Sequence, residues 1–185
     1  WKYREQKTNA SFQWNNNNFN ANYGGIPKNV FLHITNPLYQ TLPLFSNLGT
    51  TGTYLYATQI NISKKSALIT AESQIKNEYS SPKTFSYQVE IWDLDNKKIG
   101  QFLGPKTTIA PGETKTVKAS QLMNKLHFWS WGYGYLYTVK TALKIDGKTI
   151  DEVQTKTGFR KTAFENGEVK LNDRIIQMKG YAQRT

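Results

Sequence analysis

Alternation of apolar and polar side chains with a period of two is the feature that most constrains how this chain folds. Residues 85–92 show the pattern most clearly, and residues 54–60, 67–75 and 135–145 repeat it. Successive side chains of a β-strand point to opposite faces of the sheet, so each run predicts a strand with one buried face.

Turn-forming residues separate these runs. Asp146-Gly147 is a typical two-residue hairpin connection, because both turn positions need a positive φ. Asp93 to Asn96 closes another strand pair, and Ala110-Pro111-Gly112-Glu113 suits a turn in which proline fixes φ. Only residues 119–126 are candidates for a helical turn. The pattern predicts an all-β fold: an immunoglobulin-like antiparallel β-sandwich over residues 53–160, with no helix longer than two turns.

The two ends of the chain do not fit the sandwich pattern, and we expect them to be partial flanking segments. Residues 11–25 are rich in asparagine and predict a loop. Val30 to Ile34 predict one strand, and residues 169–178 predict a hairpin with Asn172-Asp173 at its turn. Residues 179–185 contain no closing element, so we interpret the chain as a piece of a longer protein.

Candidate catalytic and metal-binding residues are sparse. Asp93 and Asp95 fall in one predicted turn, and neighbouring Asp151 and Glu152 would face opposite sides of a strand, so neither pair suits acid/base catalysis. The two histidines, at positions 33 and 127, are far apart, and the chain has no cysteine. Thiolate metal sites and disulfides are therefore excluded, and we expect no metal, no cofactor and no catalytic residue in this chain.

The net charge of +11 raises the question of nucleic acid. The basic residues are spread along the chain, whereas nucleic-acid-binding proteins usually gather them on one face or arm. We therefore predict no nucleic-acid partner. No apolar run approaches the roughly 20 residues that span a bilayer, so we predict no membrane span either.

Three stretches, in this order, resemble motifs of glycoside hydrolase family 2, which includes β-galactosidases, β-glucuronidases and β-mannosidases. Residues 24–32 (GGIPKNVFL) are similar to the end of the family's sugar-binding domain. Residues 129–138 (WSWGYGYLYT), followed by a hairpin and Gly158-Phe159-Arg160, are similar to the end of its immunoglobulin-like domain. Residues 171–180 (LNDRIIQMKG) are similar to the lead into its catalytic barrel.

The resemblance implies three segments. Residues 1–48 would be the end of a sugar-binding jelly roll with a connector, and residues 49–160 the immunoglobulin-like sandwich. Residues 161–185 would be a lead-in hairpin and the first strand of a TIM barrel. The chain would then be a non-catalytic structural domain of a retaining, β-galactosidase-like enzyme that hydrolyses β-galactosides or related β-glycosides. Its partners would be the jelly roll and the barrel of the same polypeptide, with a carbohydrate as the substrate of the whole protein.

The resemblance also implies roles for residues near the end of the chain. A strand that enters the barrel would deliver Arg184, and less directly Gln183, toward the sugar site at its C-terminal end. We also consider a periplasmic or extracellular location in a bacterium.

The aromatic run at residues 128–137 has two interpretations. Tryptophan and tyrosine rings stack on sugars, which would suit a free-standing carbohydrate-binding or adhesion module. They also fill cores and interfaces between domains, and we favour this interpretation. We expect Trp129 to be mostly buried, and Trp131, Tyr133 and Tyr181 to belong to a surface that docks on a neighbouring domain.

Overall fold

Antiparallel strands make up nearly all the regular structure of residues 29–180, the part of the chain that the computed structural model describes. Residues 35–178 form one unit, and residues 29–34 and 179–180 belong to a second one. The first sheet of the larger unit contains β1 (Leu38–Gln40), β2 (Thr53–Asn61), β3 (Ser66–Asn77) and β7 (Thr114–Met123). The second contains β4 (Lys83–Trp92), β5 (Lys98–Leu103), β6 (Thr107–Ile109), β8 (Tyr137–Ile145) and β9 (Lys148–Thr157). The third contains β10 (Thr162–Glu165), β11 (Glu168–Leu171) and β12 (Arg174–Ile176).

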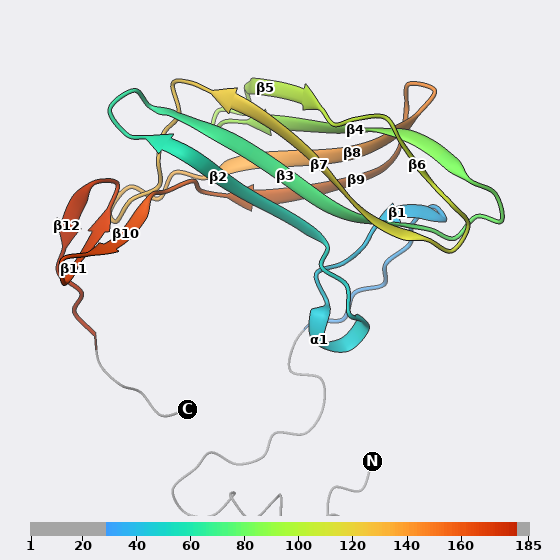
Figure 1. Ribbon diagram of the computed structural model, residues 1–185, viewed down its shortest axis with the longest axis horizontal. Coiled ribbons are helices and arrows are strands. Elements are labelled where there is room, and N and C mark those ends of the chain that lie inside the picture. Colours follow the sequence, from blue (N-terminus) through green and yellow to red (C-terminus); the bar gives the residue numbers. More distant parts are fainter. Residues whose placement is uncertain (1–28, 181–185) are drawn as a thin grey trace, which may run out of the picture. The chain divides into compact units, whose positions relative to one another are not determined.

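The first two sheets pack face to face as a β-sandwich, which confirms the predicted all-β fold (Figure 1). Strand β3 lies at the centre of the first sheet, with β7 on one side and β1 and β2 on the other. Strands β4 and β8 lie at the centre of the second. Every second residue over 67–75 and 85–91 is at most 1% exposed, and these side chains meet in one core. The alternation in the sequence therefore marks the two facing surfaces of the sandwich.

The predicted turns also form. Asp146 and Gly147 both have positive φ, at 48° and 79°, and they connect β8 to β9. Asn172 and Asp173, with φ of 50° and 65°, connect β11 to β12 in the same way. Glycine and short polar residues tolerate this region of φ, which is why these dipeptides predict hairpins.

Strand β2 presents its aromatic side to the outside of the sandwich. Leu55 and Ala57 pack against the core, whereas Tyr54 is 63% exposed. A β-bulge follows Thr58, where Gln59 has a φ of 50°, and it returns Ile60 to the core. The extra residue of a bulge changes the face on which later side chains lie, so the aromatic run 54–60 does not mark a single buried face.

Two predicted segments differ from the structure. Residues 119–123 continue strand β7, and not a helical turn, because β7 pairs with β3 along its whole length. Val30 to Ile34 do not form the predicted strand. Their side chains are exposed, and a strand with no neighbour to satisfy its backbone gains little stability. Strand β1 forms instead at residues 38–40, before the predicted start of the sandwich at residue 49, and pairs with β3.

Helical structure in residues 29–180 is limited to α1 (Phe45–Leu48), a single turn. No helix in this part of the chain is long and apolar enough to cross a membrane.

A buried glutamine joins the two sheets of the sandwich. The side-chain nitrogen of Gln40 donates to the backbone oxygen of Thr141 and to Oδ2 of Asp151, both at 3.0 Å. Its side-chain oxygen accepts from the hydroxyls of Thr141 at 2.6 Å and Ser73 at 2.9 Å. Ser73 in turn bonds the hydroxyl of Tyr87 at 2.8 Å, and burial raises the pKa of Tyr87 to about 12. Gln40 thereby links strand β1 to strands of both sheets.

We predict that Gln40→Ala lowers the free energy of unfolding by about 2–4 kcal/mol, because it removes the side-chain hydrogen bonds to Thr141, Ser73 and Asp151 of the two sheets and leaves a cavity among them. Urea denaturation of the purified chain measures this change. Gln121→Ala is the matched control, because the Gln121 side chain of β7 is exposed, and it should change stability by less than about 0.5 kcal/mol. Equal effects of the two substitutions would contradict a special role for Gln40.

Candidate docking surface around the aromatic loop

Residues 128–136, here called the aromatic loop, form the second part of the connection between β7 and β8 and contain a tight turn. The backbone groups of Ser130 and Tyr133 bond each other at 3.0 and 2.9 Å. Gly132 has a φ of 77° inside this turn, a value that side chains other than glycine rarely adopt. The turn holds Trp131 at its tip, where the side chain is 68% exposed, and Tyr133 beside it is 48% exposed.

The base of the aromatic loop is fixed by the Gly158-Phe159-Arg160 segment. The backbone nitrogen of Trp129 donates to the backbone oxygen of Phe159 at 2.8 Å, and the Arg160 guanidinium lies 5.2 Å from the Trp129 ring centre. A Cβ atom at Gly158 would lie 2.9 Å from Cβ of Trp129 and 3.0 Å from the backbone oxygen of Tyr135. Only glycine fits this approach, so each residue of the motif has a local packing reason.

Four rings in successive contact, here called the aromatic ladder, join the aromatic loop to the core. His127 stacks on Tyr135 with ring centres 4.7 Å apart, Tyr135 lies 4.9 Å from Tyr137, and Tyr137 lies 5.7 Å from Phe159. Tyr137 and Phe159 are buried, and desolvation raises the pKa of Tyr137 to about 12. The Tyr137 hydroxyl accepts the backbone N–H of His127 at 2.7 Å.

The ladder ends at the exposed rim of the loop. The Tyr133 hydroxyl bonds Nδ1 of His127 at 3.1 Å, which links the exposed tyrosine to the stacked rings. Aromatic pairs at such separations add to the stability gained from burial. The exposed rings of the loop are therefore held by a rigid base and not by a mobile segment.

Hollows lie on both sides of the aromatic loop. One, of about 590 Å³, is lined by Gly134 and Leu136 of the loop together with residues of β4, β8, β9 and the turn after β4. The other, of about 360 Å³, is lined by Phe128, Ser130 and Tyr133 together with residues of the β2–β3 and β11–β12 turns. Exposed aromatic side chains beside hollows are features that protein interfaces use.

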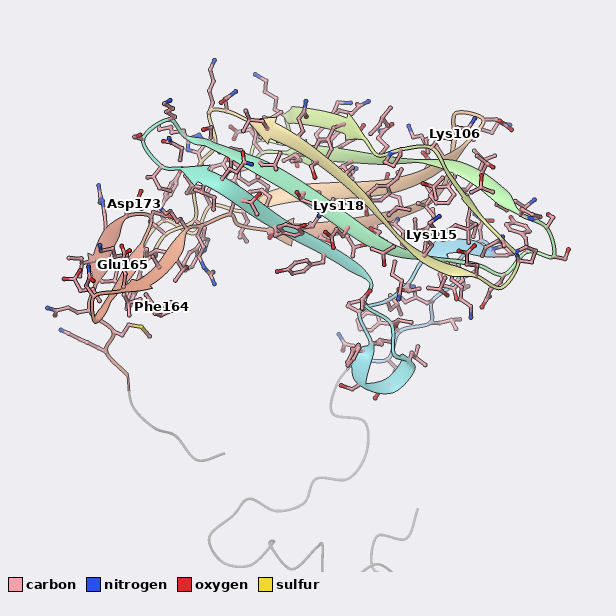
Figure 2. The ribbon with its side chains drawn as sticks, viewed as in Figure 1. Lys106, Lys115, Lys118, Phe164, Glu165 and Asp173 are labelled. Atoms are coloured by element: carbon pink, nitrogen blue, oxygen red, sulfur yellow. The ribbon has the colours of Figure 1, made fainter. Side chains whose placement is uncertain are left out.

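The three-stranded sheet adds apolar side chains near its end of the sandwich. Phe164 is 77% exposed, Ile175 60% and Met178 72%. Figure 2 shows Phe164 at the surface of this sheet, next to Glu165, which forms an ion pair with Lys170. Asn172 ties the sheet to the aromatic loop, because its side-chain nitrogen donates to the backbone oxygen of Trp129 at 2.9 Å.

The sequence-predicted site residues divide into two groups. Trp131 and Tyr133 are exposed and lie in the same turn, while Trp129 is less exposed, with the Arg160 guanidinium over its ring. Tyr181, Gln183 and Arg184 lie outside the described residues. A role of any of these residues in docking or substrate binding stays a prediction.

The acidic residues singled out in the sequence have structural contacts. Asp93 accepts the backbone N–H groups of Asp95 and Lys97 at 3.0 and 2.8 Å and so shapes the turn after β4. Asp151 accepts from Gln40. Within residues 29–180, no group of three or more histidine, cysteine or acidic side chains is placed to hold a metal ion. The Gln40 and Asp151 contact was missed from the sequence, since no local pattern pairs residues so far apart in the chain.

Known proteins with similar sequences and structures identify the family. The family model described as "Glycosyl hydrolases family 2" matches residues 53–160. A β-glucuronidase of Formosa agariphila is 34% identical over 96% of this chain, and the chain spans 18% of that relative. A solved β-glucuronidase structure of the same family superposes with a TM-score of 0.73, at 32% identity over 80% of this chain and 15% of that one.

A further structure, a putative β-galactosidase from Bacteroides fragilis, superposes with a TM-score of 0.66. It is 27% identical over 78% of this chain, which covers 21% of its length. The chain thus corresponds to less than a quarter of each of these three proteins. The family match, the sandwich and the Gly158-Phe159-Arg160 anchor agree, and the chain belongs to family 2 of the glycosyl hydrolases.

Proposed function

We propose that this chain is the non-catalytic spacer of a family 2 glycosidase, which holds a preceding sugar-binding domain and a following catalytic barrel in a set orientation. The observation that carries the proposal is the aromatic loop, which exposes Trp131 and Tyr133 on a base anchored to the core. Solvent-exposed aromatic side chains on a rigid base are typical of the centre of a protein interface.

The register of β3 supports the spacer function. Strand β1, where the larger unit begins, pairs with β3 at its Asn77 end. The backbone N–H of Leu126, just before the aromatic loop, donates a hydrogen bond to the backbone oxygen of Lys65, at the opposite end of β3. A strand rises about 3.3 Å per residue, so the twelve residues of β3 separate these places by on the order of 35 Å. Because one continuous strand joins the two ends, it would hold the domains at these ends in a fixed relative orientation, with no hinge between them.

The substrate of the whole protein is proposed to be a β-glucuronide. The Formosa agariphila relative and the structure with the TM-score of 0.73 are both named as β-glucuronidases, which favours this sugar over the β-galactoside expected from the sequence. In retaining glycosidases two carboxylates about 5–5.5 Å apart carry out the reaction, and we assign both to the barrel.

A carbohydrate-binding module is the second candidate. The rings of Tyr54 and Tyr56 lie 5.3 Å apart on the outer side of β2, and Tyr54 is exposed. Such a pair offers stacking surface to a sugar ring. Millimolar or tighter binding of an oligosaccharide to the purified chain in calorimetry, lost on Tyr54→Ala, would favour this function over the spacer.

We predict that the purified chain hydrolyses neither aryl β-glucuronide nor aryl β-galactoside, because the acidic residues within 29–180 lie in turns, ion pairs or the Gln40 contact. A longer chain that includes the barrel should hydrolyse the glucuronide, and Arg184→Ala should lower that activity. Turnover by the short chain that survives repurification and disappears in Asp93→Asn or Asp151→Asn would contradict the prediction.

We predict that Trp131→Ala with Tyr133→Ala weakens the coupling between the sandwich and the following domain by about 2–4 kcal/mol, the transfer free energy of two large aromatic side chains. Calorimetry of the whole protein should then show two unfolding transitions where the unchanged protein shows one. The same double substitution should change the stability of the isolated chain much less, and Tyr54→Ala serves as the control for loss of an exposed ring. A single unchanged transition would contradict the docking role.

A further inference from the structure

The hollow of about 360 Å³ beside the aromatic loop is built by three connections that are distant in the sequence. The β2–β3 turn contributes Ile62 and Lys65, and the β7–β8 connection contributes Leu126, Phe128 and Tyr133 among others. The β11–β12 hairpin contributes Leu171, Asn172 and Arg174. Leucine, isoleucine and phenylalanine side chains form part of its lining, and the other lining residues are polar or charged.

The charged side chains that line this hollow are both basic. They are Lys65 and Arg174, and no acidic side chain is among the lining residues. Among the described residues neither cation forms an ion pair, whereas neighbouring Asp173 pairs with Lys161. Both side chains are exposed, and two cations at the same hollow attract an anion more strongly than either cation alone.

The walls of the hollow are held in place before any partner binds. Lys65 has a φ of 52° in its tight turn, and its backbone oxygen accepts the N–H of Leu126 at 2.8 Å. Asn172 donates to the aromatic loop and accepts the N–H of Lys161 at 3.0 Å. Tyr133 is fixed by its bond to His127. Binding here would therefore cost little rearrangement of the backbone.

We propose that this hollow binds an aspartate or glutamate side chain of the next domain of the same polypeptide. This inference rests on the proposed spacer function and names the chemistry of its partner. The hollow borders both Tyr133, at the rim of the docking surface, and strand β12, two residues before the larger unit ends at Met178. The Formosa agariphila relative is more than five times as long as the matched segment, so such a domain is available within one chain.

The two cations of the hollow suit a carboxylate both in the sign of their charge and in the geometry of their hydrogen-bond donors. A guanidinium presents a planar pair of donors that match the two oxygens of a carboxylate, and the Lys65 ammonium adds a second cation. This chain carries a net charge of +11, which an acidic surface on the neighbouring domain would offset. A carboxylate held between Lys65 and Arg174 would fix the rotation of the neighbour about the contact made by Trp131.

The test uses the whole protein with Lys65→Glu and Arg174→Glu, singly and together. The unchanged whole protein is expected to unfold in one calorimetric transition, because its domains are docked. We expect each single substitution to lower the midpoint of this transition by several degrees, and the double substitution to split the transition in two. Lys115→Glu is the matched control, since Lys115 is an exposed lysine near the start of β7, paired with Ile75 toward the far end of β3 from Lys65 (Figure 2). One acidic residue of the next domain, changed to lysine, should restore the single transition in the Arg174→Glu protein.

Three results would overturn the proposal. In the first, both charge reversals leave the transition as Lys115→Glu does, while the Trp131 and Tyr133 substitutions still uncouple the domains. This result would support the spacer function and refute the carboxylate contact. If charge reversal dissociates a dimer in sedimentation and leaves domain coupling unchanged, the occupant is a second copy. If sodium sulfate shifts the amide resonances around the hollow in the isolated chain, while the reversals leave coupling unchanged, the site binds a free anion.

Discussion

The side-chain amide of Gln40 is the contact on which the arrangement of the two sheets depends. Strand β1 has only three residues, and its ladder with β3 alone would hold it weakly. A buried amide costs free energy unless its donors and acceptors are paired, and here Thr141, Ser73 and Asp151 pair them. Because these partners come from both sheets, a slip of either sheet would break several hydrogen bonds at once, whereas apolar contacts alone would tolerate small slips.

A second group of contacts, the aromatic ladder, connects the buried core to the exposed side chains of the aromatic loop. Tyr137 belongs to β8 and is buried, yet its hydroxyl bonds the backbone just before the aromatic loop. The exposed Tyr133 is connected to the same rings through His127. A loop this rich in aromatic residues would collapse onto the sandwich if its base were flexible, and the bonds to Phe159 and Asn172 prevent this. The exposure of Trp131 is thus a property that the core imposes, which is the condition for a preformed interface.

The sequence was sufficient to predict the sandwich because alternation and turn chemistry act over a few residues. The runs 67–75 and 85–91 and the Asp146-Gly147 turn were predicted correctly for this reason. The bulge at Gln59 and strand β1 were not predicted, since both depend on pairing with β3, distant along the chain. The same limit applies to the candidate site. Trp131 and Tyr133 could be found as an aromatic run, but the hollow joins residue 65 to residue 174, which no local pattern connects.

The position of these two buried systems suits the proposed function of a spacer between two domains. The Gln40 contacts lie toward the Asn77 end of β3, and the aromatic loop and the hollow lie toward its Ser66 end. Each end therefore has its own rigid anchor, and the continuous ladders of β3 with β2 and β7 join them. A spacer with a flexible anchor at either end would let its neighbour tumble, because a single aromatic contact restricts translation but not rotation. In the proposed arrangement, the cationic hollow beside Tyr133 would add a second, directional contact, and two contacts of different kinds are the least that define an orientation.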